Sequence, residues 1–210
     1  MSDSQLPLVS VIIPTYNRAK YVAEAIDSVL TQDYPQIELI VVDDGSTDET
    51  ADIVQCYGNR LIYLCQENQG VAAARNSGIA FAHGRFLAFL DSDDIWVEGK
   101  LSWQMALLQQ NHHLDAVYGH SAEFFTAKLN VADFARMSNL AQKMPSYAAS
   151  AQLIRRASFD LVGLFKTGFE VEIDREWYAR AQEAGLLNEM LPDVVYYRRM
   201  HQIRSIAHEP

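Results

Sequence analysis

Cysteine and positive charge are both scarce in this chain of 210 residues. The two cysteines, Cys56 and Cys65, lack the spacing of a metal-binding motif, which favours reduced thiols that pack inside a cytoplasmic protein. There are 17 Lys and Arg against 27 Asp and Glu, and the formal net charge is −10. This excess of negative charge argues against nucleic acid or an anionic membrane surface as a partner. An anionic ligand would need a metal ion or locally placed cations to hold it.

Long apolar runs are also missing. None approaches the roughly 20 residues of a membrane span, and the first ten residues lack the basic start and apolar core of a signal peptide. No internal repeat or low-complexity linker interrupts the sequence. With 49% hydrophobic and 21% charged residues, the composition is globular. We therefore expect a cytoplasmic protein with one domain over residues 1–210.

The first half of the chain alternates between predicted strands and helices. Short apolar, β-branched runs predict strands at Leu8–Ile13, Glu38–Val42, Leu61–Cys65 and Phe86–Leu90. Helical periodicity predicts helices from Arg18 to near Pro35, from Ser46 to near Gly58, and from Gly70 to Gly84. This order, with short links, predicts a parallel sheet with right-handed crossovers.

Two helix starts carry recognisable capping residues. Asn17 is suited to cap the helix that would begin at Arg18. Ser46 and Glu49 have the spacing of a capping box for the next helix.

The second half has a weaker pattern. Residues 121–150 give no clear prediction. Around them we expect helices at Lys100–Gln110, Arg156–Leu161 and Asp174–Ala184, and strands at Asp115–Gly119, Ala151–Ile154 and Val194–Tyr197.

The strand Phe86–Leu90 ends in three carboxylates, Asp91, Asp93 and Asp94. Open α/β sheets bind ligands at the carboxyl ends of their strands. Clustered like charges are unfavourable without a positive group among them, and Mg²⁺ or Mn²⁺ prefers such oxygen ligands. The alternative is a solvated turn that caps the following helix. These residues alone do not decide between the two.

Four polar groups follow predicted strands or lie on the helix between them: Thr15–Arg18, Asp43–Asp44, Arg75–Asn76 and Asp91–Asp94. In a doubly wound sheet these positions converge on one edge. Solvated turns have no reason to align in this way, so the pattern predicts a single site.

The segments PTYNR, VVDDGSTDET, NQGVAAARNSGI and FLDSDD, in this order, resemble the family 2 glycosyltransferases of the GT-A fold. The resemblance covers Leu8 to about Gln110 and resumes in LIRRASFDLVGLF, IDREWYARAQEAG and LPDVVYYRRMH. It implies a single GT-A-like (Rossmann-like) α/β domain with a mostly parallel sheet flanked by helices. Residues 7–110 would bind a nucleotide sugar, and residues 111–210 would hold the acceptor and the catalytic groups.

The resemblance also implies the donor site. The nucleoside would lie against Pro14, Thr15, Asn17 and Arg18, with Asp43 or Asp44 on the base or ribose and Arg75 close by. A turn and cap role is the alternative for Asp43. The DxD element of the family corresponds to Asp91, Ser92 and Asp93, which would reach the ribose and a Mn²⁺ or Mg²⁺ ion. Asp94 would be a further ligand or, as we favour, a helix cap.

The same resemblance implies inversion at the anomeric carbon, with a carboxylate as general base. Asp174, ahead of Trp177 and Arg180, fits that position best, and Glu172 and Glu170 are the alternatives. A plain helix-capping role for Asp174 is compatible with catalysis.

His201 would lie near the diphosphate and metal, although a lone histidine is more often an ordinary surface or core residue. Arg198 and Arg199 could supply positive charge for phosphate. After His201 the chain departs from the family pattern: it reads Gln202-Ile203-Arg204-Ser205 and ends at Pro210, which suggests a short or rebuilt lid over the donor.

The expected reaction is sugar transfer from a nucleotide donor, UDP-linked, to the hydroxyl of a glycan, lipid-linked or protein acceptor. A sugar-phosphate nucleotidyltransferase would need a Gly-rich basic loop where PTYNR stands. A phosphatase would carry its DxD after the first strand. A binding module that kept the nucleotide site but lost turnover is the alternative outside enzymes. The sequence indicates neither the sugar nor the oligomeric state.

Overall fold

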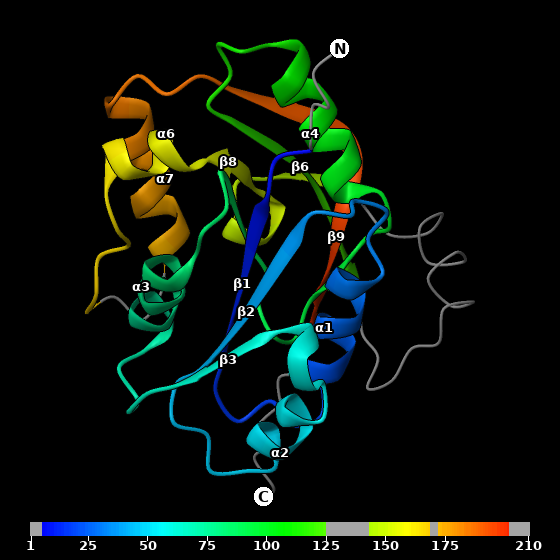
Figure 1. Ribbon diagram of the computed structural model, residues 1–210. Coiled ribbons are helices and arrows are strands. Elements are labelled where there is room, and N and C mark those ends of the chain that lie inside the picture. Colours follow the sequence, from blue (N-terminus) through cyan, green and yellow to red (C-terminus); the bar gives the residue numbers. More distant parts are fainter. Residues whose placement is uncertain (1–5, 125–142, 169–171, 202–210) are drawn as a thin grey trace, which may run out of the picture.

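The computed structural model describes residues 6–124, 143–168 and 172–201. Within them a nine-stranded sheet has the order β3-β2-β1-β4-β8-β6-β9-β5, with β7 paired to β6, and helices pack on both of its faces (Figure 1).

The strands are β1 Val9–Thr15, β2 Ile37–Asp43, β3 Ile62–Cys65, β4 Phe86–Phe89, β5 Ile95–Trp96, β6 Ala116–Phe124, β7 Lys143–Ser146, β8 Leu153–Arg155 and β9 Asn188–Arg199. The helices are α1 Val22–Leu30, α2 Thr50–Gln55, α3 Val71–Phe81, α4 Lys100–Gln110, α6 Arg156–Val162 and α7 Ile173–Glu183, with 3₁₀ turns η1 Gly58–Arg60 and η2 Ala149–Ala151.

Strands β3, β2, β1 and β4 are all parallel. Each connection between them carries a helix, as the alternating pattern predicts. The predicted α/β fold is confirmed. The carboxyl ends of these strands lie along one edge of the sheet, so the loops that follow β1, β2 and β4 are neighbours.

The second half of the chain completes the same sheet. β8 pairs antiparallel with β4 and with β6, β9 runs parallel to β6, and β5 pairs antiparallel with β9. Residues far apart in sequence therefore join one sheet, and the described chain forms a single α/β domain.

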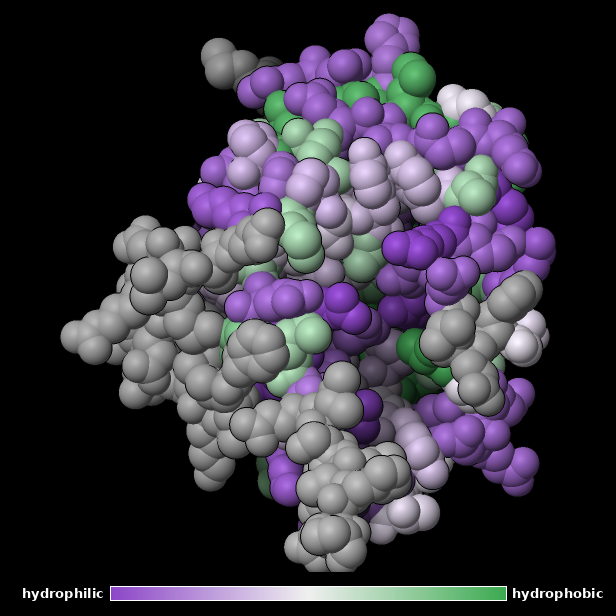
Figure 2. All heavy atoms as spheres, turned by 180° about the vertical axis from the view of Figure 1, so that it is seen from behind, coloured by the Kyte–Doolittle hydropathy of each residue, from purple (hydrophilic) through white to green (hydrophobic). Residues whose placement is uncertain are grey.

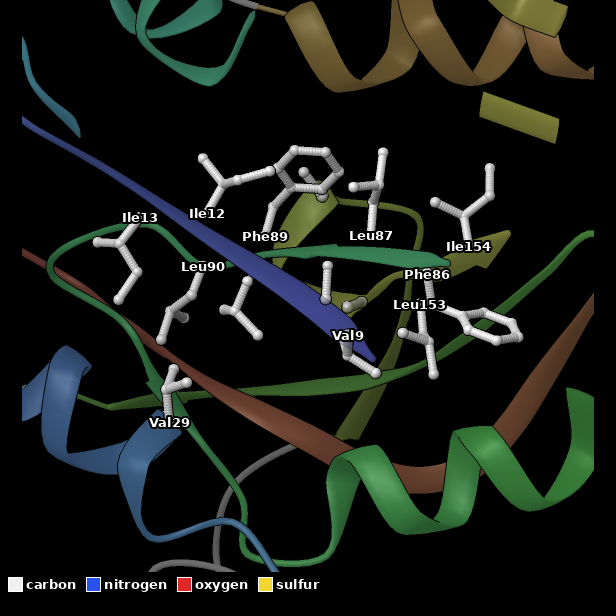
Figure 3. Close-up of a cluster of buried hydrophobic side chains, with 14 of the residues drawn as sticks. Val9, Ile12, Ile13, Val29, Phe86, Leu87, Phe89, Leu90, Leu153 and Ile154 are labelled. Carbon is white, nitrogen blue, oxygen red and sulfur yellow. The ribbon is translucent and has the colours of Figure 1, made fainter. Parts of the chain in front are cut away.

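The core lies on both faces of β1 and β4. Figure 3 shows Ile12 and Phe89 pointing to one face, toward α3 and α7, while Val9 and Leu90 point to the other, toward α1 and α4. All four side chains are fully buried. Burial on both faces explains why these strands read as continuous apolar runs.

The loops after β1 and β2 differ from the capping prediction. α1 begins at Val22, and Asn17 adopts a left-handed conformation with φ 51°. Its side-chain oxygen accepts the backbone N–H of Thr47 (2.8 Å), and its own N–H donates to the Ser46 hydroxyl (2.9 Å). The predicted caps at Asn17 and Ser46 are therefore wrong, because both side chains bind the neighbouring loop instead of a helix end.

Two further expectations concern the cysteines and membrane-spanning helices. Cys56 and Cys65 carry free thiols but are exposed, so the prediction that they pack in the interior is wrong. Among the described residues, no helix has the length and apolar character needed to cross a membrane.

Candidate active site

A cavity of about 1100 Å³ lies over the carboxyl ends of β1, β2 and β4 and is closed on its other side by residues near β7, α7 and β9. Seen from behind, hydrophilic side chains border a hollow near the middle of the molecule (Figure 2). The predicted site residues among its lining are Pro14, Thr15, Arg18, Asp44, Arg75, Asp91, Ser92, Asp93, Glu172 and Asp174. The structure thus brings together side chains from both halves of the chain.

Arg75 joins the two main carboxylates of the cavity. Its Nη2 donates to Asp91 Oδ1 at 2.7 Å and its Nη1 to Asp174 Oδ1 at 2.6 Å. Arg75 lies on α3; its guanidinium is buried and lies over the ring of Phe165. Pairing with both carboxylates outweighs desolvation and raises the pKa of Arg75, so it carries its charge at any working pH. Asp91 and Asp174 are therefore held on one cation.

The η2 turn fixes the same two aspartates from the other side. The backbone N–H of Ala149 donates to Asp174 Oδ2 at 2.9 Å, and the N–H of Asp91 donates to the Ser150 hydroxyl at 3.2 Å. The sequence pattern does not predict this turn, because a backbone donor leaves no residue-type signal. Asp174 lies in the first turn of α7, where Glu172 is the N-cap residue. Asp174 is thus not the helix cap.

Asp93 is held by groups from both ends of the chain. Its Oδ2 accepts from Arg18 Nε at 3.2 Å and contacts His201 Nε2 at 2.8 Å. The ring of His201 in turn packs beside Tyr21, with centroids 5.5 Å apart. The structure thus brings Arg18, expected beside the nucleoside, and His201, expected near the metal, to one carboxylate oxygen of Asp93.

Asp94 has a structural environment different from the expected cap. It is buried, and its Oδ1 accepts the backbone N–H of Arg199 at 2.9 Å, whereas α4 starts after Gly99. Burial, followed by the nearby negative charge of Asp91, raises the pKa of Asp94 well above its usual range. The cap assignment is wrong, because the carboxylate ties the loop after β4 to β9.

Arg199 adds a second tie between these segments. Its Nε donates to the Asp93 carbonyl at 2.9 Å, and its Nη2 pairs with Glu24 on α1. The guanidinium lies over the rings of Tyr21 and Phe124, at 4.6 and 4.5 Å. Arg199, on β9, therefore holds the loop after β4, which carries Asp91 to Asp94, and helix α1 together.

The two aspartates after β2 differ in position. Asp44 lines the cavity, and it accepts the N–H groups of Gln69 (2.9 Å) and Gly70 (2.7 Å), which shapes the start of α3. Asp43 is not part of the cavity lining; its oxygens accept from the N–H of Ser46 and the hydroxyl of Tyr63. Of this pair, Asp44 is placed to meet a ligand.

The remaining predicted residues are placed as follows. Glu172, at the cavity rim, has φ 66° and pairs with Arg175 at 3.0 Å. Asn17 does not line the cavity. Glu170 lies outside the described residues. Thr15 Oγ1 and Arg75 Nε are buried without a hydrogen-bond partner among the described residues.

The carboxylate oxygens of Asp91 and Asp93 are suited to bind a hard divalent cation. Asp91 keeps 41% of its side-chain surface exposed and Asp93 18%, and carboxylate oxygens are the ligands that Mg²⁺ and Mn²⁺ prefer. The described residues hold no preassembled group of three or more His, Cys, Asp or Glu ligands.

Comparisons with known proteins give consistent results. An uncharacterised glycosyltransferase of Rickettsia prowazekii is 45% identical over 111 residues, 53% of this chain and 35% of the relative. The putative teichuronic acid biosynthesis glycosyltransferase TuaG of Bacillus subtilis is 44% identical over 120 residues, 55% of this chain and 47% of TuaG. The matched part is thus less than half of either relative.

Among solved structures, Staphylococcus aureus TarS residues 1–349, crystallised with UDP-GlcNAc, superposes with a TM-score of 0.77 at 26% identity, over 97% of this chain and 61% of that one. The sequence profile of glycosyl transferase family 2 matches residues 10–163. This match spans most of the described sheet and the loops that carry Asp44, Arg75 and Asp91. The chain therefore belongs to glycosyl transferase family 2.

Proposed function

We propose that this chain transfers a sugar from a nucleotide-sugar donor to an acceptor hydroxyl with inversion, and that Asp174 is the general base. The observation that carries the proposal is the pairing of Arg75 with both Asp91 and Asp174. It holds the carboxylate of the DxD element and the candidate base on the two terminal nitrogens of one guanidinium, so that both carboxylates lie in the same cavity.

The donor occupies the side of the cavity built by residues 7–110. Pro14, Thr15 and Arg18 line that side and contact the nucleoside. Asp44 lies across the same part of the cavity. The complex of TarS with UDP-GlcNAc supports a UDP-linked donor. Residues 111–210 supply the base and the acceptor side.

Asp91, Asp93 and His201 would hold a Mn²⁺ or Mg²⁺ ion. Such an ion neutralises the diphosphate and assists its departure. Asp93 is positioned for this by Arg18, and its contact with His201 places an imidazole at the same oxygen.

Asp174 performs the proton transfer. The acceptor oxygen bonds to the anomeric carbon from the face opposite the diphosphate, while its proton passes to a carboxylate oxygen of Asp174. The bond from the anomeric carbon to the phosphate oxygen breaks, and its electron pair leaves with the nucleoside diphosphate. Each carboxylate oxygen offers two lone pairs, so Asp174 can accept this proton while Arg75 and the Ala149 N–H hold it.

The test is transfer by Asp174→Asn, measured with a panel of nucleotide sugars. The amide keeps the size of the side chain but removes the proton acceptor, so we expect transfer to fall by about 10²-fold or more with donor affinity nearly unchanged. Glu172→Gln is the matched control, because Glu172 is an exposed neighbour at the same rim. Loss of transfer in Glu172→Gln alone would move the base to Glu172.

Wild-type turnover decides between an enzyme and a module that only binds the donor. A binding module would show a rise in melting temperature with nucleotide sugar but would release no nucleotide in a single-turnover assay. Release of nucleotide that depends on an added acceptor supports transfer.

A further inference from the structure

Three tyrosines form a cluster at the acceptor side of the cavity. The rings of Tyr147 and Tyr178 lie 4.4 Å apart at 36°, and Tyr118 meets them edge-on at 5.3 and 5.7 Å. Tyr118 is buried, and its hydroxyl accepts from Gln152 at 2.8 Å. Tyr147 and Tyr178 line the cavity. Tyr118 thus fixes the orientation of the two rings that face the cavity.

Tyr147 keeps an exposed face within this cluster. Tyr178 covers one side of its ring, yet 42% of Tyr147 stays accessible to solvent. Met144, 41% exposed, and Pro145 line the cavity beside it. A large exposed aromatic surface in a polar cavity is costly without an apolar partner. Supported ring faces of this kind bind flat apolar surfaces.

The cluster is next to the proposed base. Tyr178 follows Asp174 by four residues on α7, which puts both on one helix face. Tyr147 precedes Ala149, whose N–H binds Asp174 Oδ2, by two residues. A molecule resting on Tyr147 therefore has its edge close to the carboxylate that would take its proton.

The charges around the cluster restrict what can bind there. Asp91, Asp174 and Glu172 contribute three carboxylates, and the guanidinium groups of Arg75 and Arg175 are already paired with them. An anionic acceptor such as a phosphodiester would meet this negative charge, and it would have to reach Arg198, which lines the cavity from β9, to find a cation outside these pairs. A lipid tail would meet the Glu172–Arg175 pair beyond the few apolar groups of Tyr147, Met144 and Pro145.

We propose that the acceptor is a neutral sugar whose pyranose ring stacks its C–H face on Tyr147, with one hydroxyl directed at Asp174. A pyranose has the required combination: one face of C–H bonds for the aromatic ring and hydroxyl groups at its edge for carboxylates. This assignment rests on the proposed function, since it names the acceptor for the same base. It makes Tyr147 the stacking residue, with Tyr118 and Tyr178 as its support.

Saturation-transfer NMR with UDP and Mg²⁺ present tests the assignment directly, because Mg²⁺ is diamagnetic. The probes are methyl β-D-glucopyranoside, methyl β-D-galactopyranoside and methyl N-acetyl-β-D-glucosaminide, with glycerol 3-phosphate and octyl phosphate as the anionic and lipid-like alternatives. We expect at least one glycoside to receive saturation at the C–H protons of one ring face. In Tyr147→Ala its affinity should fall about fivefold or more, as for loss of an aromatic contact, whereas Tyr147→Phe should retain it.

Phe81→Ala is the matched control, because Phe81 is an exposed aromatic side chain that does not line the cavity. Thermal unfolding and UDP affinity of Tyr147→Ala verify that the variant is folded. The assignment is overturned if no glycoside binds, if Tyr147→Ala binds it as the wild type does, or if one of the phosphates binds in its place. Wild-type protein that releases no nucleotide with any donor contradicts the proposed function instead, whatever the glycosides show.

Discussion

Arg75 is a buried cation shared by two carboxylates that lie 16 and 99 positions away in the chain. A buried charge is tolerated when it is fully paired, and removal of one partner leaves an uncompensated charge that costs several kcal/mol. The side chain is therefore both a structural tie and the group that sets the distance between Asp91 and Asp174. A change at Arg75 can be read separately in stability and in transfer.

Arg75→Lys should reduce transfer much more than it reduces donor affinity. An ammonium keeps the charge but lacks the rigid fork that spans two carboxylates, so Asp174 loses its fixed position. We expect transfer to fall by about 10²-fold, as for a catalytic group displaced by about 1 Å, while UDP affinity changes far less. Steady-state kinetics and calorimetry measure the two quantities.

Arg85→Lys is the control for the loss of a guanidinium, since Arg85 is exposed and lies outside the active-site cavity. Wild-type transfer by Arg75→Lys would show that the fork does not position the base.

Several carboxylates that line the candidate site were predicted from motifs, but their partners were not. Asp91, Asp93 and Asp174 were expected as functional carboxylates. The contact between Arg75 and Asp174 depends on how α7 packs against α3, which no local pattern encodes. Asp94 shows the same limit: its neighbours in sequence suggest a cap, and only the burial against β9 reveals its bond to Arg199.

Helix α3 carries Arg75 and packs directly on β1. A Cβ at Gly78 would lie 2.5 Å from Ile12 Cγ2 and 3.2 Å from Val42 Cγ2. Both side chains are fully buried, so they have little room to move. The glycine therefore lets the helix approach the sheet closely enough to place Arg75 at the strand ends.

Gly78→Ala should destabilise the protein. Better helix propensity contributes about 1 kcal/mol, but an inserted methyl group in a packed core costs about 1–3 kcal/mol. We expect a net loss of about 1 kcal/mol in urea unfolding, with a drop in transfer because Arg75 shifts. Phe81→Ala, at the exposed end of the same helix and outside the cavity, should change either quantity little. A Gly78→Ala protein more stable than the wild type would contradict this packing argument.

The elements of the first half were predicted well, because β1, β2 and β4 are largely buried apolar strands and each helix follows a short turn. The second half was harder. The predicted strand Val194–Tyr197 is the buried end of β9, whose first six residues are exposed or half-buried and include Pro192. Its long pairing with β6 contains register shifts near His120. Tertiary contacts, not local periodicity, extend this strand.

For the whole molecule, the dependence of the free energy of unfolding on pH should contain a contribution from one buried amine, that of Lys100. Lys100 is fully buried over the ring of Trp96, and its Nζ donates to Gln104 Oε1 at 2.7 Å. Burial lowers the pKa of Lys100 well below its usual range. The unfolded chain then binds more protons than the folded one between the lowered pKa and about 10.4, so stability rises with pH in this window.

Lys100→Met should remove that part of the slope. A full proton of difference corresponds to about 1.4 kcal/mol per pH unit, and urea unfolding at several values between pH 7 and 9.5 measures it. Higher pH is unsuitable, because burial also raises the pKa of Tyr34, to about 12. Equal slopes for wild type and Lys100→Met would mean that Lys100 titrates as an exposed lysine.

Donor and metal should stabilise the folded protein together. A ligand at 100 times its dissociation constant adds about 2.7 kcal/mol, or about 5–10 °C in melting temperature for a chain of this size. We expect UDP-GlcNAc with Mn²⁺ to give a shift of this order and a smaller one after chelation with EDTA. In Asp93→Asn the effect of Mn²⁺ should disappear. An equal shift with and without metal would contradict the metal assignment.

The strand order has a consequence for how the chain acquires its structure during synthesis. β1 to β4 pair with one another and can do so once residues up to 89 have left the ribosome, whereas among the described residues the outer side of β4 pairs with β8 alone, at residues 153–155. Until then β4 is an apolar strand with an open edge, the kind of surface that pairs with other chains. Aggregation during expression should therefore be governed by the interval in which the ribosome adds residues 90–152, and slower translation of that stretch should lower the yield of native protein.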